Sequence, residues 1–272
     1  MLRVNEIERS IITNFRKDIY SPFSKAVRSY KLINENDKIA VCISGGKDSM
    51  VLAKLMQEFQ KHGKYHFDLE FIVMDPGYDK ENLQKIKDNA STLNIPINIF
   101  KSDIFEVSEK LNETHPCYMC ARMRRGFLYK KAQELGCNKI ALGHHFDDVI
   151  ETILLSIFYG GEFKSMPPKL KSLNFKDMEL IRPLYLIREK DIIRWAKYNN
   201  LEFINCACKF TKDNKTQNTS KRKEIKQLIS KLKETNPNIE YNIFKSTENV
   251  NIETLLGYKK NNKKIMLTEL ND

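Results

Sequence analysis

Short apolar runs alternate with amphipathic stretches through the first half of the chain. Four of the runs are rich in β-branched residues and have the length of buried strands: Lys38–Ile43, Leu69–Met74, Ile95–Phe100 and Lys139–Leu142. Three stretches between them place apolar residues at helical spacing: Met50–Lys61, Lys80–Leu93 and Ala121–Leu135. This alternation predicts an α/β fold of the Rossmann-like kind, with a parallel sheet, right-handed crossovers and helices on both faces.

The regions on either side of this alternation read mainly as helices. Residues 1–36 combine helical spacing with aromatic and basic side chains, and Val149–Phe158 and Glu189–Asn199 also read as helices, whereas Ser165–Leu170 reads as a loop. The lysine-rich tail predicts two helices broken near Pro237. We therefore expect an N-terminal helical segment (1–36), a central α/β domain that carries the clustered cysteines (37–210) and a C-terminal helical tail (211–272).

The first predicted strand runs directly into a glycine turn. Its residues are Ser44, Gly45, Gly46, Lys47, Asp48 and Ser49, and a predicted helix follows them. Adjacent glycines let the backbone approach an anion closely, and the N–H groups of a helix N-terminus then hold phosphate. The turn lacks the four residues that the common nucleoside-triphosphate loop places between its two glycines. A phosphate site at these six residues is favoured over a tight turn without a ligand.

Polar residues follow the ends of two other predicted strands. Asp75 ends the second, and Gly143, His144, Asp147 and Asp148 follow the fourth. Because ligands bind beyond the carboxyl ends of parallel strands, these residues are expected to share one crevice with the glycine turn. Gly143 and His144 are candidates for contact with a nucleotide, and Asp75 either contacts the nucleotide or forms a turn. Asp147 and Asp148 either hold Mg²⁺ against phosphates, orient a substrate or cap a helix.

Six cysteines occur, and four of them lie in two clusters. Cys117 and Cys120 form a C-x-x-C pair, and Cys206 and Cys208 form a second pair, whereas Cys42 reads as core and Cys137 as structural. Four thiolates suit a closed zinc site, and three suit a [4Fe-4S] cluster with one open iron. The nearby Arg122, Arg124 and Arg125 favour the thiolate form. These residues leave the choice between zinc and iron–sulfur open.

Charge and hydropathy indicate which partner and which cellular location to expect. The 46 basic and 35 acidic residues give a net charge of +11 over 272 residues, which is typical of a nucleic-acid partner or of a lysine-rich solvated surface. No apolar run approaches the length that spans a bilayer, and the first residues lack a secretory signal. We expect a cytoplasmic protein with no membrane partner.

Several motifs, taken in their order along the chain, resemble those of the tRNA 2-thiocytidine synthetase family of the ATP pyrophosphatase (PP-loop) superfamily. The resemblance covers about residues 38–208 and implies an adenine nucleotide alpha hydrolase-like fold. The matching words are Ser44–Ser49, Cys117–Cys120, Arg124–Gly126, Gly143–His145, Asp147–Asp148, Tyr159–Gly161, Met166–Leu170, Ile181–Leu184 and Arg188–Ile192.

This resemblance implies a reaction and its cofactors. ATP would adenylate the C2 oxygen of a tRNA pyrimidine, with a cytidine of the anticodon loop as the implied target, and sulfur would then replace AMP. Asp48, Arg124 and Asp148 are the implied catalytic residues. Cys117, Cys120 and Cys206 are the implied [4Fe-4S] ligands, with Cys208 as the alternative third ligand. The resemblance also implies a cysteine desulfurase or sulfide as the sulfur source, and a homodimer.

The chain departs from the family pattern at several positions. Phe146 stands where the family has arginine, Cys206-Ala207-Cys208 replaces a wider cysteine spacing, and Asn218–Arg222 blurs a further motif. These departures bear on the identity of the target base. Two alternatives stay open: a paralogue that moves sulfur to another substrate, and a zinc-stabilised nucleotide- or RNA-binding protein without thiolation. Lysidine synthesis is disfavoured because it does not need the Cys117–Cys120 pair.

Overall fold

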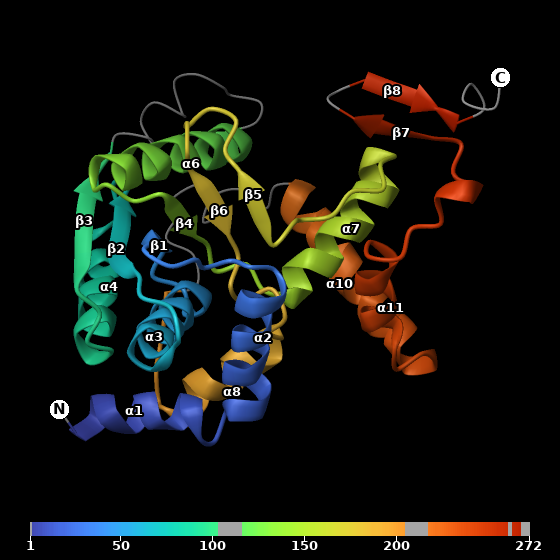
Figure 1. Cartoon of the computed structure of the whole chain (residues 1–272). Helices are drawn as coiled ribbons and strands as arrows, with labels where there is room; N and C mark the ends of the chain where they lie inside the picture. The colour runs from blue at the N-terminus through green and yellow to red at the C-terminus, as the bar shows by residue number, and fades with distance from the viewer. Residues whose placement is uncertain (1, 103–115, 205–216, 261–262, 268–272) are drawn as a thin grey trace. The chain divides into compact units, whose positions relative to one another are not determined.

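The computed structural model describes residues 2–102, 116–204, 217–260 and 263–267 of the chain (Figure 1). Of residues 2, 116–121 and 217–220 it describes the backbone only. The described chain divides into two compact units, residues 1–149 with 166–221, and residues 150–165 with 222–272. The three segments that the sequence predicts remain predictions.

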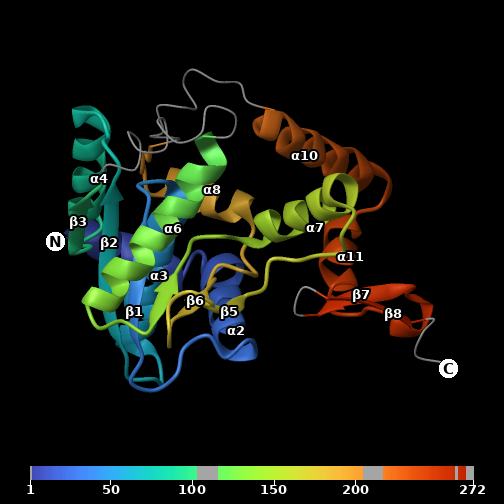
Figure 2. The same ribbon diagram turned by 90° about the horizontal axis from the view of Figure 1, so that it is seen from above.

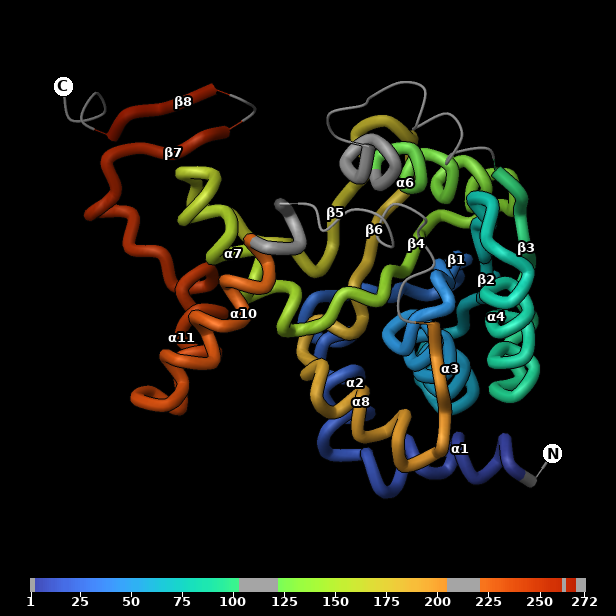
Figure 3. Tube along the Cα trace, turned by 180° about the vertical axis from the view of Figure 1, so that it is seen from behind, coloured from blue at the N-terminus to red at the C-terminus, as the bar shows by residue number. Residues whose placement is uncertain are grey.

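The first unit is built on a six-stranded sheet. Its strands are β1 (Lys38–Ile43), β2 (Asp68–Asp75), β3 (Ile97–Lys101), β4 (Lys139–Ala141), β5 (Lys169–Lys171) and β6 (Glu179–Ile181). They lie in the order β3-β2-β1-β4-β6-β5, as Figure 3 shows from right to left. Five strands are parallel, and β5 pairs antiparallel with β6 at the edge. The predicted mostly parallel α/β fold is confirmed, but the sheet is mixed where an all-parallel one was expected.

Helices cover both faces of this sheet, as alternation along β1 requires. Ile39 and Val41 join the core on one face, and Ala40 and Cys42 join the core on the other. The first core includes side chains of α3 (Lys47–His62), α4 (Lys80–Thr92) and α8 (Glu189–Tyr198). The second core includes Tyr129 and Ala132 of α6 (Pro116–Glu134), which crosses the strands in Figure 2.

The N-terminal segment packs against the first core. Its elements are α1 (Leu2–Ile12), a π-helical turn at Arg16–Tyr20 and α2 (Ser21–Ser29). Ile11, Ile19 and Phe23 are fully buried there, and Trp195 of α8 donates a hydrogen bond from Nε1 to Ser10 Oγ at 3.2 Å. The predicted helical N-terminus is therefore part of the first compact unit.

The second unit combines helices with a short hairpin. It contains most of α7 (Phe146–Gly160), most of α10 (Gln217–Thr235), α11 (Ile239–Ser246), and a hairpin of β7 (Gly257–Lys260) and β8 (Lys263–Met266). Glu151 of α7 is buried, 3.6 Å from both Arg222 and Lys226 of α10. The two tail helices are confirmed on either side of Pro237, whereas the hairpin was not predicted.

Several predicted boundaries were wrong by a few residues, for local reasons. The third strand begins at Ile97 rather than Ile95, because Pro96 has no N–H for the ladder and Ile95 N–H bonds to Ala90 O at the end of α4. The predicted loop 165–170 ends in β5. Arg182 Nη1 donates to Pro167 O, and Arg182 N–H donates to Pro168 O, so β5 is fastened to the chain after β6.

Candidate active site

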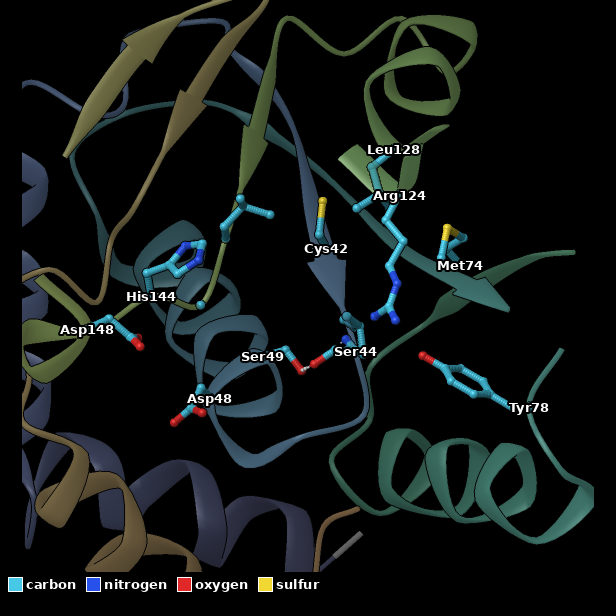
Figure 4. A pocket seen from close by; sticks show the side chains of 13 residues that line it. Cys42, Ser44, Asp48, Ser49, Met74, Tyr78, Arg124, Leu128, His144 and Asp148 are labelled. Carbon is cyan, nitrogen blue, oxygen red and sulfur yellow. Dashed lines mark hydrogen bonds between the residues drawn. The ribbon is translucent and has the colours of Figure 1, made fainter. Parts of the chain in front are cut away.

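A pocket opens where the strand order of the sheet reverses. Strand β1 lies between β2, which follows it in the chain, and β4, from which the sheet continues in the opposite direction. The crevice beyond β1 and β4 is therefore the switch point, where α/β sheets bind ligands. The cavity has a volume of about 320 Å³ and is shown in Figure 4. It is lined by Cys42, Ile43, Ser44, Asp48, Ser49, Met74, Tyr78, Arg124, Leu128, Leu142, Gly143, His144 and Asp148.

The glycine turn forms the rim of this pocket and the start of α3. Gly45 has φ of +84°, and a Cβ there would lie 2.6 Å from atoms of both Ile86 and Ile204, so the position requires glycine. Gly46 is the N-cap residue, and the first intrahelical bond runs from Met50 N–H to Gly46 O at 3.2 Å. Helix α3 therefore begins at Lys47, three residues before the predicted start. The N–H groups of Lys47, Asp48 and Ser49 precede that bond and are available to an anion.

Two serines close the turn on itself. Ser49 Oγ donates to Gly46 O at 2.9 Å and accepts from Ser44 N–H at 3.2 Å, and the two serine hydroxyls are 3.2 Å apart. Figure 4 shows both hydroxyls at the pocket wall. The turn is thus held in its conformation by its own side chains, which leaves it preorganised for a ligand.

Gly143 allows the β4–α7 connection to pass against the same turn. A Cβ at Gly143 would lie 3.0 Å from the Asp48 carbonyl carbon and 3.1 Å from both Asp48 O and Ser49 N. These are backbone atoms of the first turn of α3, which cannot move aside cheaply. Gly143, predicted to approach a nucleotide, therefore also packs directly on the backbone of the glycine turn.

Asp48 carries a partly buried carboxylate at the pocket. Its Oδ2 accepts from Lys47 Nζ at 3.1 Å, whereas its buried Oδ1 accepts no hydrogen bond from the described residues and lies 3.9 Å from His145 Nε2. Burial raises the pKa of Asp48 above its ordinary value, and the nearby His145 and Lys47 only partly offset this. An oxygen of this kind suits a cation or a donor brought by a ligand.

The two adjacent aspartates Asp147 and Asp148 have different surroundings. Asp148 lines the pocket, and its Oδ2 accepts from His145 N–H at 3.1 Å. Both oxygens of Asp147 are engaged by the start of α8: Oδ1 by Arg188 Nη2 at 3.2 Å, and Oδ2 by Glu189 N–H at 2.7 Å. Asp148 is therefore the better placed of the two for Mg²⁺, and Asp147 caps a helix.

Lys47 points to a second cavity on the other side of the turn. Its Nζ lies 3.0 Å from Glu189 Oε1 as well as 3.1 Å from Asp48 Oδ2. Burial lowers the pKa of Lys47, but the two carboxylates outweigh it and hold the pKa above its usual range. This cavity, about 430 Å³, is lined by Gly46, Lys47, Asp48, Glu189, Ile193, Ala196, Lys197, Leu201, Phe203 and Ile204.

Residues from two further elements complete the wall of the first pocket. Figure 4 shows the Arg124 guanidinium of α6 reaching into the pocket toward Ser44, with Tyr78 on the opposite side. Asp75, the last residue of β2, does not line the pocket. Its Oδ1 accepts from Gly77 N–H at 3.0 Å and Tyr78 N–H at 2.8 Å, so it shapes the turn that carries Tyr78. Sequence reasoning missed Tyr78, His145 and Glu189, although the last two stand inside quoted motifs.

The clustered cysteines lie largely outside the part that the structure describes. Cys117 and Cys120 fall in the first turns of α6, where only the backbone is described, and Cys206 and Cys208 lie beyond the described residues. Arg124 follows Cys120 on the same helix by one turn, about 6 Å along its axis. The described chain also reaches Ile204, two residues before Cys206, at the glycines of the turn. Among the described residues, no group of three His, Cys, Asp or Glu side chains forms a metal site.

The other two cysteines are described. Cys42 is buried in β1 and also lines the pocket, and burial raises the pKa of its thiol well above the usual range. Burial likewise raises the pKa of Cys137 to about 11. Both thiols are therefore unreactive at neutral pH, in agreement with their predicted structural roles.

Fold, turn and pocket define the class to which the chain belongs. Residues 14–232 match the PP-loop domain family, so this is a PP-loop protein. None of the helices in the described ranges is long and apolar enough to cross a membrane.

Comparison with curated proteins places the chain more narrowly. It is 39% identical over 242 residues to the tRNA-cytidine(32) 2-sulfurtransferase of Coxiella burnetii, covering 86% of this chain and 90% of that protein. It is 36% identical over 261 residues to the protein of that name in Aeromonas hydrophila, covering 94% and 83%. Within the PP-loop proteins, the chain thus belongs to the tRNA-cytidine(32) 2-sulfurtransferase family.

A solved structure supports the fold. The chain superposes on the U34-tRNA thiolase NcsA from Methanococcus maripaludis, solved with its [4Fe-4S] cluster, with a TM-score of 0.67 and 24% identity. The match covers 88% of this chain and 80% of that one. The adenine nucleotide alpha hydrolase-like fold that the resemblance implied is thereby confirmed.

Proposed function

We propose that this chain is an ATP-dependent tRNA sulfurtransferase that replaces the C2 oxygen of a cytidine with sulfur. The proposed base is cytidine 32, the position named for its relatives. One observation carries the proposal: Arg124, on the helix that begins with the Cys117–Cys120 pair, reaches the pocket formed by the glycine turn. The same helix therefore carries two proposed cluster ligands and one side chain of the nucleotide pocket. This arrangement suits a reaction in which ATP and sulfur both act at C2 of the base.

The glycine turn would bind the phosphates of ATP. The N–H groups at the start of α3 and the Lys47 ammonium group supply positive charge, and the pocket between β1 and β4 takes the nucleoside. The C2 oxygen of cytidine attacks the α-phosphorus, the bond from that phosphorus to the bridging oxygen breaks, and pyrophosphate leaves. Adenylation makes AMP the leaving group, so sulfur can then displace it at C2.

The carboxylates of the pocket support a magnesium site. The buried Oδ1 of Asp48 accepts no hydrogen bond from the described residues, and Asp148 shares the cavity with it. Hard oxygen ligands of this kind would suit Mg²⁺. We assign Asp48 and Asp148 to this role, and Arg124 to orientation of the base or of its developing charge.

The cysteines would hold the sulfur-bearing group. Cys117, Cys120 and Cys206 are the proposed ligands of a [4Fe-4S] cluster, with Cys208 as the alternative third ligand. The described chain on either side supports this, since α6 and Ile204 both reach the glycine turn. When bound, a cluster with three thiolate ligands offers one open iron for sulfur delivery.

Reaching C2 of an anticodon-loop cytidine requires that base to leave its stack. We propose tRNA as the substrate, sulfide or a cysteine desulfurase as the sulfur source, a homodimer as the assembly and the cytoplasm as the location. The basic N-terminal segment and the lysine-rich tail would contact the phosphates of tRNA.

The test is anaerobic purification, metal and sulfide analysis, and a thiolation assay with tRNA, MgATP and sulfide. We expect about four iron and four sulfide per chain, and 2-thiocytidine by nucleoside mass spectrometry. Cys117→Ala should abolish thiolation and retain ATP binding, whereas Cys137→Ala is the matched control that should retain both. One zinc and no iron after anaerobic reconstitution, with no 2-thiocytidine, would sink the proposal.

A further inference from the structure

The ammonium group of Lys47 is held away from the nucleotide pocket. Lys47 is absent from the residues that line that pocket, although its neighbours Asp48 and Ser49 are present. It lines the second cavity, where Nζ lies 3.0 Å from Glu189 Oε1. The positive side chain of a phosphate-binding turn is therefore paired with a carboxylate from another helix, 142 residues further along the chain.

The charges around Lys47 oppose the binding of an anion. Glu189 and Asp48 both lie within 3.1 Å of the one ammonium group, so the three side chains carry a net charge of −1. Because the pKa of Lys47 lies above its usual range, the lysine stays protonated in this arrangement. A phosphate at the turn can form an ion pair with Lys47 only if the ammonium group leaves one of these two carboxylates.

The backbone of Glu189 is held independently of Lys47. Glu189 is the first residue of α8, and its N–H group donates to Asp147 Oδ2 at 2.7 Å. Asp147 also accepts from Arg188, which fastens the start of α8 to the start of α7. Asp48, by contrast, is the residue next to Lys47 on the same helical turn, so the helix itself keeps the two side chains close. The contact that can open is therefore the one to Glu189.

We propose that Glu189 is a positioning residue for ATP binding that acts through Lys47. Its carboxylate competes with the phosphates of ATP for the ammonium group. The inference rests on the proposed function only in requiring that MgATP binds at the glycine turn. Glu189 thus weakens ATP binding, and its charge rather than its size sets the effect.

A double-mutant cycle tests this directly. The dissociation constant of the magnesium complex of α,β-methylene ATP is measured by calorimetry for the wild-type chain, Glu189→Gln, Lys47→Ala and the double variant. Glu189→Gln should tighten binding by about two- to fivefold, the range of a partly exposed ion pair. In the Lys47→Ala background, the same substitution should change binding by less than about 1.5-fold. In turnover assays, Glu189→Gln should lower KM for ATP and leave kcat within about twofold.

Other results overturn the inference. Weaker binding by Glu189→Gln would mean that Glu189 holds Lys47 in its productive position. An equal gain in the Lys47→Ala background would mean a general charge effect rather than exchange of a partner. Glu202→Gln is the matched control, because Glu202 is exposed and pairs with Lys85 at 3.0 Å. This variant should bind the nucleotide with wild-type affinity. A wild-type chain that fails to bind the nucleotide would instead overturn the proposed function itself.

Discussion

The two cavities on either side of the glycine turn differ in what the same six residues contribute to them. The nucleotide pocket receives the hydroxyls of Ser44 and Ser49, together with Arg124 from α6. The second cavity receives Lys47, faced by Glu189 and by an apolar wall that includes Phe203. Asp48 lines both.

This division follows from helix geometry. Lys47, Asp48 and Ser49 are the first three residues of α3, and successive residues of a helix point about 100° apart. A motif that is continuous in sequence therefore lines two cavities, and its ammonium group lies on the side away from the nucleotide pocket. Substitutions on each side should separate phosphate binding from the control of Lys47.

The largest expected effect comes from Gly143→Ala, which should disrupt the pocket side. The new Cβ would lie 3.0–3.1 Å from backbone atoms of Asp48 and Ser49, so the turn must shift. We expect about 1–3 kcal/mol lower unfolding free energy and at least about a hundredfold less AMP formation. Denaturant unfolding and a coupled AMP assay measure the two effects.

Gly126→Ala provides the matched control for this substitution. A Cβ at Gly126 of α6 meets nothing within 4 Å, and alanine favours a helix over glycine. It should keep activity and hold or slightly raise stability. Equal losses in both variants would contradict the packing role of Gly143.

Arg124→Ala should produce the next largest effect. It removes the guanidinium that Figure 4 shows in the pocket, and we expect a loss of about 10- to 100-fold in kcat/KM for tRNA thiolation. Lys130→Ala, at an exposed position of the same helix, should keep wild-type kinetics. Normal kinetics for Arg124→Ala would remove Arg124 from the reaction.

Asp148 and Asp147 should respond differently to substitution although they are adjacent. Asp148→Ala should raise the Mg²⁺ concentration for half-maximal turnover by about tenfold, because it removes a pocket carboxylate. Asp147→Ala should leave this Mg²⁺ dependence unchanged and cost about 1–2 kcal/mol of unfolding free energy, because it uncaps α8. A Mg²⁺ titration of activity combined with denaturant unfolding distinguishes them, and the reversed pattern would exchange their roles.

The smallest effect concerns Asp48 and pH. Burial raises the pKa of Asp48 above its ordinary value of 3.8, so the folded chain binds this proton more tightly than the unfolded chain. The ionised carboxylate therefore costs folding free energy at neutral pH, and the cost disappears as the pH falls below that ordinary value. Asp48→Asn should raise Tm by about 1–3 °C at pH 7 while weakening turnover. Calorimetric scans should show this gain shrinking toward pH 4, and a gain independent of pH would contradict the assignment.

The central strands and the glycine turn could be predicted from sequence because their signals are local. The β-branched run Lys38–Ile43 matches β1 residue for residue, and the turn follows it directly. The edge pair β5–β6 could not be predicted, since each strand has three residues and Arg182 fastens one side of the pair to Pro167. Such contacts depend on tertiary structure and leave no periodicity.

The candidate site likewise has a part that could be predicted from sequence and a part that could not. Ser44, Asp48, Arg124 and Asp148 were predicted from motifs, and the structure brings all four to one cavity. The roles of Asp147 and Glu189 depend on the meeting of α7 and α8, which sequence spacing does not reveal. Phe146, which the sequence marks as a departure from the expected motif, has the guanidinium of Arg188 4.8 Å from the centre of its ring.

The central claim is that ATP activates the C2 oxygen of a tRNA cytidine, and an isotope measurement tests it most directly. Transcribed tRNA that carries [2-¹⁸O]cytidine is incubated anaerobically with the reconstituted protein, MgATP and sulfide, and the released AMP is analysed by mass spectrometry. One ¹⁸O is expected in each AMP that accompanies a 2-thiocytidine. Thiolation that yields AMP without ¹⁸O would show that the base oxygen never reached the α-phosphorus, and would rule out adenylation of the base.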